Sequence, residues 1–208
     1  MIELWHCKDA RSLRALWALE ELGVAYDLKL MAFPPRLHHP EFLQVNPLGT
    51  VPFLKDGTTE MTESCAMVHY LAMRYGRGTL GVPVDDPDYG DWLNWIYHAD
   101  ATLTFPQTLV LRYGRFEAKD RRQPQVVEDY TQWFYSRLKL VNARLEHHEW
   151  LCADRFTAAD VAVGYAVYLG EIVGLAEHYK PQTRAYLERL KLRPAFQRAV
   201  APGVPLWE

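Results

Sequence analysis

The chain has few cysteines, little net charge and no long hydrophobic run, and each of these absences excludes a class of protein. Its 208 residues include three cysteines, Cys7, Cys65 and Cys152, whose spacing fits neither a disulfide framework nor a metal cluster, so we expect no metal and a reducing cytoplasm. The formal net charge of -3 indicates neither a nucleic-acid partner nor an anionic membrane surface. No stretch approaches the roughly 18 apolar residues of a membrane span, and the N-terminus lacks the pattern of a signal peptide.

The sequence contains instead a hydrophobic pattern that changes near its middle. Short apolar runs predict strands at residues 2–6, 26–31 and 51–54, and a hairpin turn at residues 55–58 leads into a fourth strand before residue 62. Helical spacing occupies residues 11–22 and the run that follows residue 64. The order βαβ and then ββα is typical of a thioredoxin-like sheet. Residues 81–87 have the composition of a linker, and helical periodicity then dominates to about residue 198. We therefore predict an α/β domain at 1–78, a linker at 79–86 and an all-helical domain at 87–208.

The stretch from Asn46 to Ser64 carries the clearest sign of a binding site. Pro52 stands in a short apolar strand, where a residue without an N–H belongs at an edge or a strand start. If the Val51–Pro52 bond is cis, we expect the N–H and C=O groups of Val51 to face outward, where an extended peptide can pair with them. Glu63 and Ser64 then open a helix, whose N-terminal N–H groups attract a carboxylate while the Glu63 side chain holds an ammonium group. The pair fits an amino-acid head group.

Four segments, taken together and in this order, resemble the soluble glutathione transferases of bacterial type. They are residues 11–23 (RSLRALWALEELG), 46–52 (NPLGTVP), 62–64 (TES) and 156–160 (FTAAD). The resemblance covers nearly the whole chain. It implies a thioredoxin-like domain that holds glutathione as co-substrate, an all-helical domain that supplies a pocket for small electrophiles, a homodimer, and a role in detoxification.

A transferase of this kind lowers the thiol pKa of bound glutathione from about 8.5 toward neutrality, because the thiolate is the nucleophile. Family members place a Tyr, Ser or Cys between the first strand and the first helix, but here Ala10 stands where several relatives carry a catalytic serine and Trp5 replaces the tyrosine. Ser12 is the first candidate, as the only hydroxyl in the segment. Arg11, a cation beside the thiolate, is the second, and Cys7, through a mixed disulfide with glutathione, is the third. Each also has a structural interpretation: a first-turn serine, a solvated charge and an inert buried thiol.

The binding residues divide between the two predicted domains. We predict that glutathione contacts Thr50, Val51, Pro52, Glu63 and Ser64, with His38 or Arg36 near its glycine end. In the second domain, an aromatic-rich stretch is interrupted by Pro106, which ends or kinks a helix. Arg112 and Tyr113 follow this break and are the predicted contacts of the second substrate, although aromatic stripes also form protein cores.

Thr157 and Asp160 have the spacing of a capping box ahead of an apolar run. The run that follows has too little charge for a surface helix, so we predict that it forms the buried central helix of the second domain. This motif is interpreted as structural.

Three functions from different classes remain open on the sequence. The first is a glutathione transferase that conjugates glutathione to small, mostly apolar electrophiles. The second is a glutathione-dependent thiol-disulfide oxidoreductase or peroxidase that acts through Cys7. The third is a non-catalytic glutathione-fold binding protein, which the alanine at position 10 makes credible.

Overall fold

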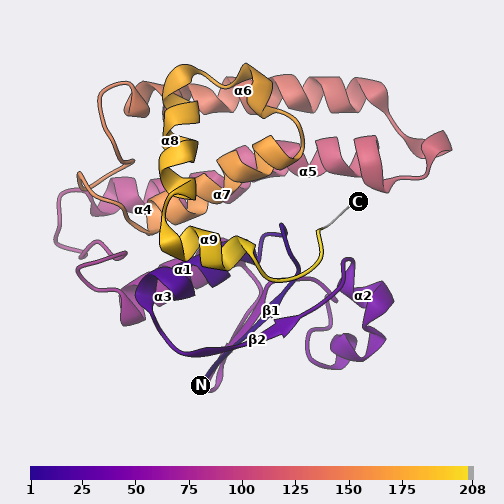
Figure 1. The fold of residues 1–208 in the computed structure, drawn as a ribbon, viewed down its shortest axis with the longest axis horizontal. Helices are drawn as coiled ribbons and strands as arrows, with labels where there is room; N and C mark the ends of the chain where they lie inside the picture. The colour runs from indigo at the N-terminus through magenta and orange to yellow at the C-terminus, as the bar shows by residue number, and fades with distance from the viewer. Residues whose placement is uncertain (206–208) are drawn as a thin grey trace. The chain divides into compact units, whose positions relative to one another are not determined.

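The computed structural model describes residues 1–205 and divides the chain into two compact units. Of the described residues, the first unit contains 1–83 and 191–205, and the second contains 84–190 (Figure 1). The last three residues of the predicted 87–208 domain lie outside the described residues.

The first unit is built on a four-stranded sheet in the order β2-β1-β3-β4. Its strands are β1 (Ile2–His6), β2 (Tyr26–Leu30), β3 (Phe53–Asp56) and β4 (Thr59–Met61). β1 runs parallel to β2 and antiparallel to β3, and β3 is antiparallel to β4. The predicted thioredoxin-like sheet, parallel in its first half and antiparallel in its second, is therefore confirmed.

Two long helices of the first unit pack against each other beside the sheet. α1 (Leu13–Leu22) buries seven consecutive residues from Leu13 to Leu19, and it ends at Gly23, whose φ of 61° is the left-handed conformation that glycine adopts without strain. α3 (Ser64–Tyr75) contacts α1 along its length. Between β2 and β3 lie the short helix α2 (Pro35–His38) and a 3-10 segment, Pro40–Gln44.

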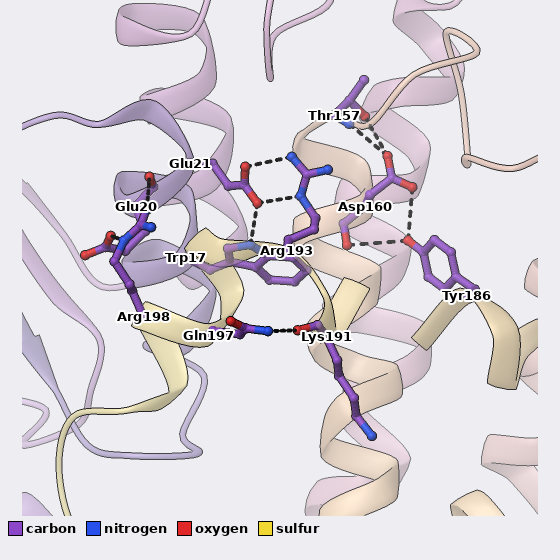
Figure 2. Close-up of polar contacts among 10 residues, drawn as sticks. All are labelled: Trp17, Glu20, Glu21, Thr157, Asp160, Tyr186, Lys191, Arg193, Gln197 and Arg198. Carbon is purple, nitrogen blue, oxygen red and sulfur yellow. Dashed lines mark hydrogen bonds and ion pairs between the residues drawn. The ribbon is translucent and has the colours of Figure 1, made fainter. Parts of the chain in front are cut away.

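A helix from the end of the chain, α9 (Pro194–Val200), completes the first unit by packing on α1 (Figure 1). The rings of Trp17 and Phe196 meet edge to face with centroids 4.8 Å apart. Arg193, just before α9, pairs with Glu21 of α1, as Figure 2 shows. The predicted all-helical domain at 87–208 differs here from the structure, because residues after 190 cluster with the sheet domain rather than with the other helices.

The second unit consists of helices. They are α4 (Tyr89–His98), α5 (Phe105–Leu111), α6 (Pro124–Leu145), α7 (Ala158–Ile172) and α8 (Pro181–Lys191). Two π-helical segments, Ala99–Thr104 and Arg112–Phe116, flank α5, and short 3-10 turns at Lys119–Arg121 and Ala176–His178 complete the unit. The helix break expected at Pro106 therefore takes the form of a π-helical turn with the proline in the first turn of α5.

α7 is the central helix of the second unit, with most of its residues buried, as predicted from its sequence. Its start carries a complete capping box: the Ala159 N–H donates to Thr157 Oγ1 at 3.2 Å, and the Thr157 N–H donates to Asp160 Oδ2 at 2.9 Å. Asp160 also accepts a hydrogen bond from the Leu151 N–H. Figure 2 shows a further one, which it accepts from the Tyr186 hydroxyl. The carboxylate therefore joins the helix start to the preceding loop and to α8. Within residues 1–205, no helix is long and apolar enough to cross a membrane.

Candidate functional site

Three strand ends and two helix starts meet at one end of the sheet in the first unit. In the antiparallel register, Trp5 of β1 pairs with Phe53 of β3, and Leu54 pairs with Met61 of β4. The loop after β1, the segment before β3 and the start of α3 consequently lie at the same end of the sheet. α1 begins from that loop, so the candidate glutathione-binding and thiol-activating segments are brought together by the strand pairing.

The segment before β3 is held by Asn46, which is almost fully buried. Its side-chain amide donates to the Thr50 carbonyl at 2.8 Å, and its side-chain oxygen accepts from the Leu48 N–H at 3.1 Å. The Val51–Pro52 bond is cis. No backbone hydrogen bond of Val51 is found within residues 1–205, so both of its backbone groups can pair with an extended peptide.

The start of α3 presents Glu63 and Ser64, the pair expected to bind the amino-acid head group. Glu63 occupies the N-cap position with an exposed side chain, and no hydrogen bond or ion pair of its carboxylate occurs in the described part of the chain. Ser64 is the first residue of the helix and is buried. Its hydroxyl oxygen accepts a hydrogen bond from Arg14 Nη1 of α1 at 3.0 Å.

Ser12 is fully buried in the loop between β1 and α1. Its Oγ lies 2.8 Å from His6 Nδ1 and accepts a hydrogen bond from the Cys7 N–H at 3.3 Å. Burial, together with the charge of Lys8, lowers the pKa of His6 to about 4, so the imidazole is neutral at pH 7. The Ser12 hydroxyl is also placed to donate to the Cys7 carbonyl oxygen at 3.2 Å. These contacts favour the structural interpretation of Ser12, because its hydroxyl holds the loop together rather than facing solvent.

The Cys7 thiol is likewise buried, and this burial raises its pKa to about 12. A thiol with such a pKa is protonated at neutral pH and is a poor nucleophile. Cys65 and Cys152 are buried free thiols as well. The environment of Cys7 therefore does not favour the thiol-disulfide reading.

Arg11 is the only one of the three thiol-activating candidates whose side chain is partly exposed. It stands directly before the N-cap residue of α1, beside Ala10. Trp5, at the position of the family tyrosine, packs against Phe42 and Phe53 with centroid distances of 6.3 and 5.3 Å. Its role is thus one of packing under the site.

The remaining predicted contacts lie at the periphery of these segments. His38 ends α2 with an exposed side chain, and Arg36 of the same short helix is exposed as well. Thr50 is exposed in the turn that Asn46 orders. Their side chains are accessible to a ligand, and contact with glutathione stays a prediction.

Arg112 and Tyr113 lie in the second unit, in the π-helical segment that follows α5. The Arg112 guanidinium pairs with Glu117 at 3.1 Å and lies 5.8 Å from the centre of the Tyr113 ring. Arg112 is exposed and Tyr113 half-buried. Their predicted contact with the second substrate remains a prediction.

Three residues that position the site were not found as site residues from the sequence: Asn46, Arg14 and His6. Asn46 is the first residue of the stretch from Asn46 to Ser64. The available signal was that asparagine often bonds to backbone groups of its own turn. Arg14 lies among the apolar residues of α1. The available signal was its helical spacing, which places this arginine on the face of the helix that packs into the core. His6 gave no specific signal.

The fold defines the class of protein: a thioredoxin-like domain followed by a helical domain, with the backbone groups of Val51 open at the strand ends. No group of three or more His, Cys, Asp or Glu side chains suited to a metal occurs in the described chain.

Comparisons with known proteins agree with this architecture. Residues 10–74 match the family model described as glutathione S-transferase, N-terminal domain. The chain is 28% identical over 206 residues to glutathione S-transferase GstB of Escherichia coli strain K12, with 96% of this chain and 98% of that protein covered. It is 29% identical to glutathione S-transferase 3 of Zea mays, covering 93% and 89% of the two chains.

Two solved structures extend the likeness to the whole fold. A glutathione transferase from Methylococcus capsulatus has a TM-score of 0.82 at 26% identity, covering 96% of this chain and 97% of that one. A theta class glutathione S-transferase from Xanthomonas axonopodis, solved with glutathione bound, has a TM-score of 0.80 at 26% identity, covering 99% and 98%. The chain is thus similar along nearly its whole length to soluble glutathione S-transferases, and its residues 10–74 match the N-terminal domain of that family.

Proposed function

We propose that this protein is a glutathione transferase that binds glutathione at the sheet edge and activates its thiol for attack on small, mostly apolar electrophiles. The observation that carries the proposal is the convergence of Val51, with its backbone groups unpaired, and the Glu63–Ser64 helix start at the end of the sheet where α1 begins. A peptide backbone can pair with Val51 while its amino-acid head group lies at Glu63 and Ser64. Detoxification of reactive compounds follows from this activity as its expected use.

Thiol activation is assigned to the start of α1. The positive end of the helix dipole and the positive charge of Arg11, a partly exposed residue, favour a thiolate over a thiol there. Ser12 was the first candidate from the sequence, but the bonds of its hydroxyl to His6 and Cys7 support a role in loop structure. We therefore place Arg11 first, with Ser12 and Cys7 behind it.

The wider organisation is also proposed from the family. We infer a homodimer in the cytoplasm, with the electrophile bound by the helical unit near Arg112 and Tyr113, and no nucleic-acid or membrane partner. The electrophile itself is left open. The two alternatives are a redox enzyme acting through Cys7, which the raised pKa of its buried thiol opposes, and a glutathione-binding protein without catalysis.

The proposal is tested by measuring the pKa of enzyme-bound glutathione from the ultraviolet absorbance of its thiolate. We expect a pKa well below the free value of about 8.5 in the parent protein. Arg11→Gln should return it toward the free value, whereas Ser12→Ala should leave it depressed. If only Ser12→Ala returns the thiol pKa toward the free value, thiol activation belongs to the Ser12 hydroxyl. If the parent protein binds glutathione without lowering its thiol pKa, the protein binds glutathione without activating it.

A further inference from the structure

Arg14 is an arginine with 0% of its surface exposed, in the middle of a run of buried residues on α1. Removing a guanidinium from water costs several kcal/mol, and an apolar side chain of similar length fills the same space without that cost. The position of this charge in the core of the first unit therefore requires a reason beyond packing. Its contact with Ser64 on α3 provides one.

The hydrogen bond from Arg14 to Ser64 fixes the direction of the Ser64 hydroxyl. A serine hydroxyl has one hydrogen to donate and two lone pairs to accept with. Because Arg14 Nη1 donates to this oxygen at 3.0 Å, the inward lone pair is occupied and the hydroxyl hydrogen must point elsewhere. No acceptor for that hydrogen is found within residues 1–205, and Ser64 retains 4% exposure at the first position of α3.

We propose that Arg14 is a positioning residue of the glutathione site, holding the Ser64 hydroxyl as a dedicated donor to the α-carboxylate of the γ-glutamyl group. Arg14 does not touch the ligand, because it has no exposed surface. It acts through the serine and adds positive charge beneath the N-terminus of α3, so both effects favour a carboxylate over a neutral amide. The exposed Glu63 beside it holds the α-ammonium group. This assignment rests on the proposed glutathione function.

The test compares binding of glutathione with binding of an analogue whose γ-glutamyl α-carboxylate is a carboxamide. In the wild-type protein the analogue should bind about 10- to 150-fold more weakly, the range for one hydrogen bond to a charged group. Arg14→Met and Ser64→Ala should each weaken glutathione binding by a similar factor and lose the discrimination. The double variant should bind no more weakly than Ser64→Ala, since the two residues act as one unit.

Steady-state kinetics separate positioning from a structural role. We expect Arg14→Met to raise the KM for glutathione while kcat at saturating glutathione changes less than about twofold, because the lost contact is made equally in the ground and transition states. Leu19→Ala is the matched control, a fully buried residue of the same helix. It should lower Tm and leave KM and the discrimination unchanged.

Arg14→Lys keeps a cation in the core and loses the planar fork, so it serves if Arg14→Met does not fold. It should lose part of the discrimination. Arg14→Met or Arg14→Lys protein that still distinguishes glutathione from the amide as well as wild type does would overturn the assignment, as would equal KM effects in Leu19→Ala. A wild-type protein that binds neither compound would instead contradict the proposed function itself.

Discussion

Arg193 donates to both carboxylate oxygens of Glu21, from Nε at 2.6 Å and from Nη2 at 2.8 Å. Glu21 Oε1 also accepts a hydrogen bond from Trp17 Nε1 at 2.9 Å (Figure 2). These bonds join α1 to the residue just before α9, 172 positions later in the sequence. A neighbouring pair, Arg198 of α9 with Glu20 of α1, joins these two helices closer to solvent.

The two pairs should differ in their contribution to stability. The side chains of Arg193 and Glu21 are 30% and 10% exposed, whereas Arg198 is 56% exposed. Arg193→Ala leaves the shielded Glu21 charge with a single donor, and we expect it to lower the free energy of unfolding by about 2 kcal/mol. Arg198→Ala should cost about 0 to 1 kcal/mol, as exposed pairs do. Urea unfolding of both variants measures this, and equal losses would contradict the assigned difference.

Asp160 should make stability depend on pH in an unusual direction. Burial raises the pKa of this carboxyl from 3.8 to about 6, despite the hydrogen bonds that it accepts from Thr157, Leu151 and Tyr186. Between pH 6 and 4 the folded protein therefore holds a proton that the unfolded chain has released, and the folded state gains stability as the pH falls. Relative to Asp160→Asn, the wild type should gain about 3 kcal/mol across this window.

The measurement is urea unfolding of both proteins at several pH values, with the difference between them isolating residue 160. A difference that is constant with pH would show that the carboxyl titrates normally. Because the capping box is structural, Asp160→Asn should retain thiol activation at a temperature where it remains folded, with a lowered Tm.

His6 should have the opposite pH dependence. Its pKa is lowered from 6.5 to about 4, so the unfolded chain binds a proton between these values that the folded protein does not. Stability is fully present above pH 6.5 and is lost as the pH falls toward 4, by about 3 kcal/mol. His6→Asn, whose amide oxygen can still accept from Ser12, should remove this loss. Unfolding at pH 5 and pH 8 tests it, and a variant that loses as much as wild type at pH 5 would place the acid sensitivity elsewhere.

Cys7 should be inert in the folded protein. Its buried thiol, with a pKa raised to about 12, should react with a disulfide reagent at neutral pH only as fast as the protein unfolds. Cys7→Ala should leave the pKa of bound glutathione unchanged. Thiol titration with and without urea compares the reactivity of Cys7 in the folded and unfolded protein. Rapid modification of Cys7 in the native protein, or a higher thiol pKa of bound glutathione in Cys7→Ala, would support a redox role for Cys7.

The sequence predicted the elements better than their partners. The strand at 2–6, the end of α1 at Gly23 and the capping box at Thr157 were all found, because hydrophobic period and capping chemistry are local signals. The strand expected at 51–54 was observed as Phe53–Asp56, because Pro52 cannot join the ladder and pairing begins after it. The return of α9 to α1 depends on contacts between residues far apart in sequence, and no local pattern reports them.

The site was predictable to the same degree. Val51, Glu63 and Ser64 were singled out from the backbone chemistry of a short segment, and the structure brings them to one end of the sheet, where their contact with glutathione stays a prediction. The sequence suggested that the Ser12 hydroxyl faces the ligand, whereas in the structure it bonds to His6 and to the Cys7 N–H. These partners depend on how the loop after β1 turns, which the sequence does not specify. Arg14 was missed because its value as a donor depends on α3 lying beside α1.

The docking of α9 onto α1 has a consequence for synthesis. The ribosome makes the strands and α1 first, but the helix that covers Trp17 emerges only after the entire second unit. Until α9 is made, the Trp17 indole of the nascent sheet domain lacks the cover that this helix provides. A fragment of residues 1–83 should therefore bind chaperones or self-associate. The final helix thus acts as the closing step of the first-made domain.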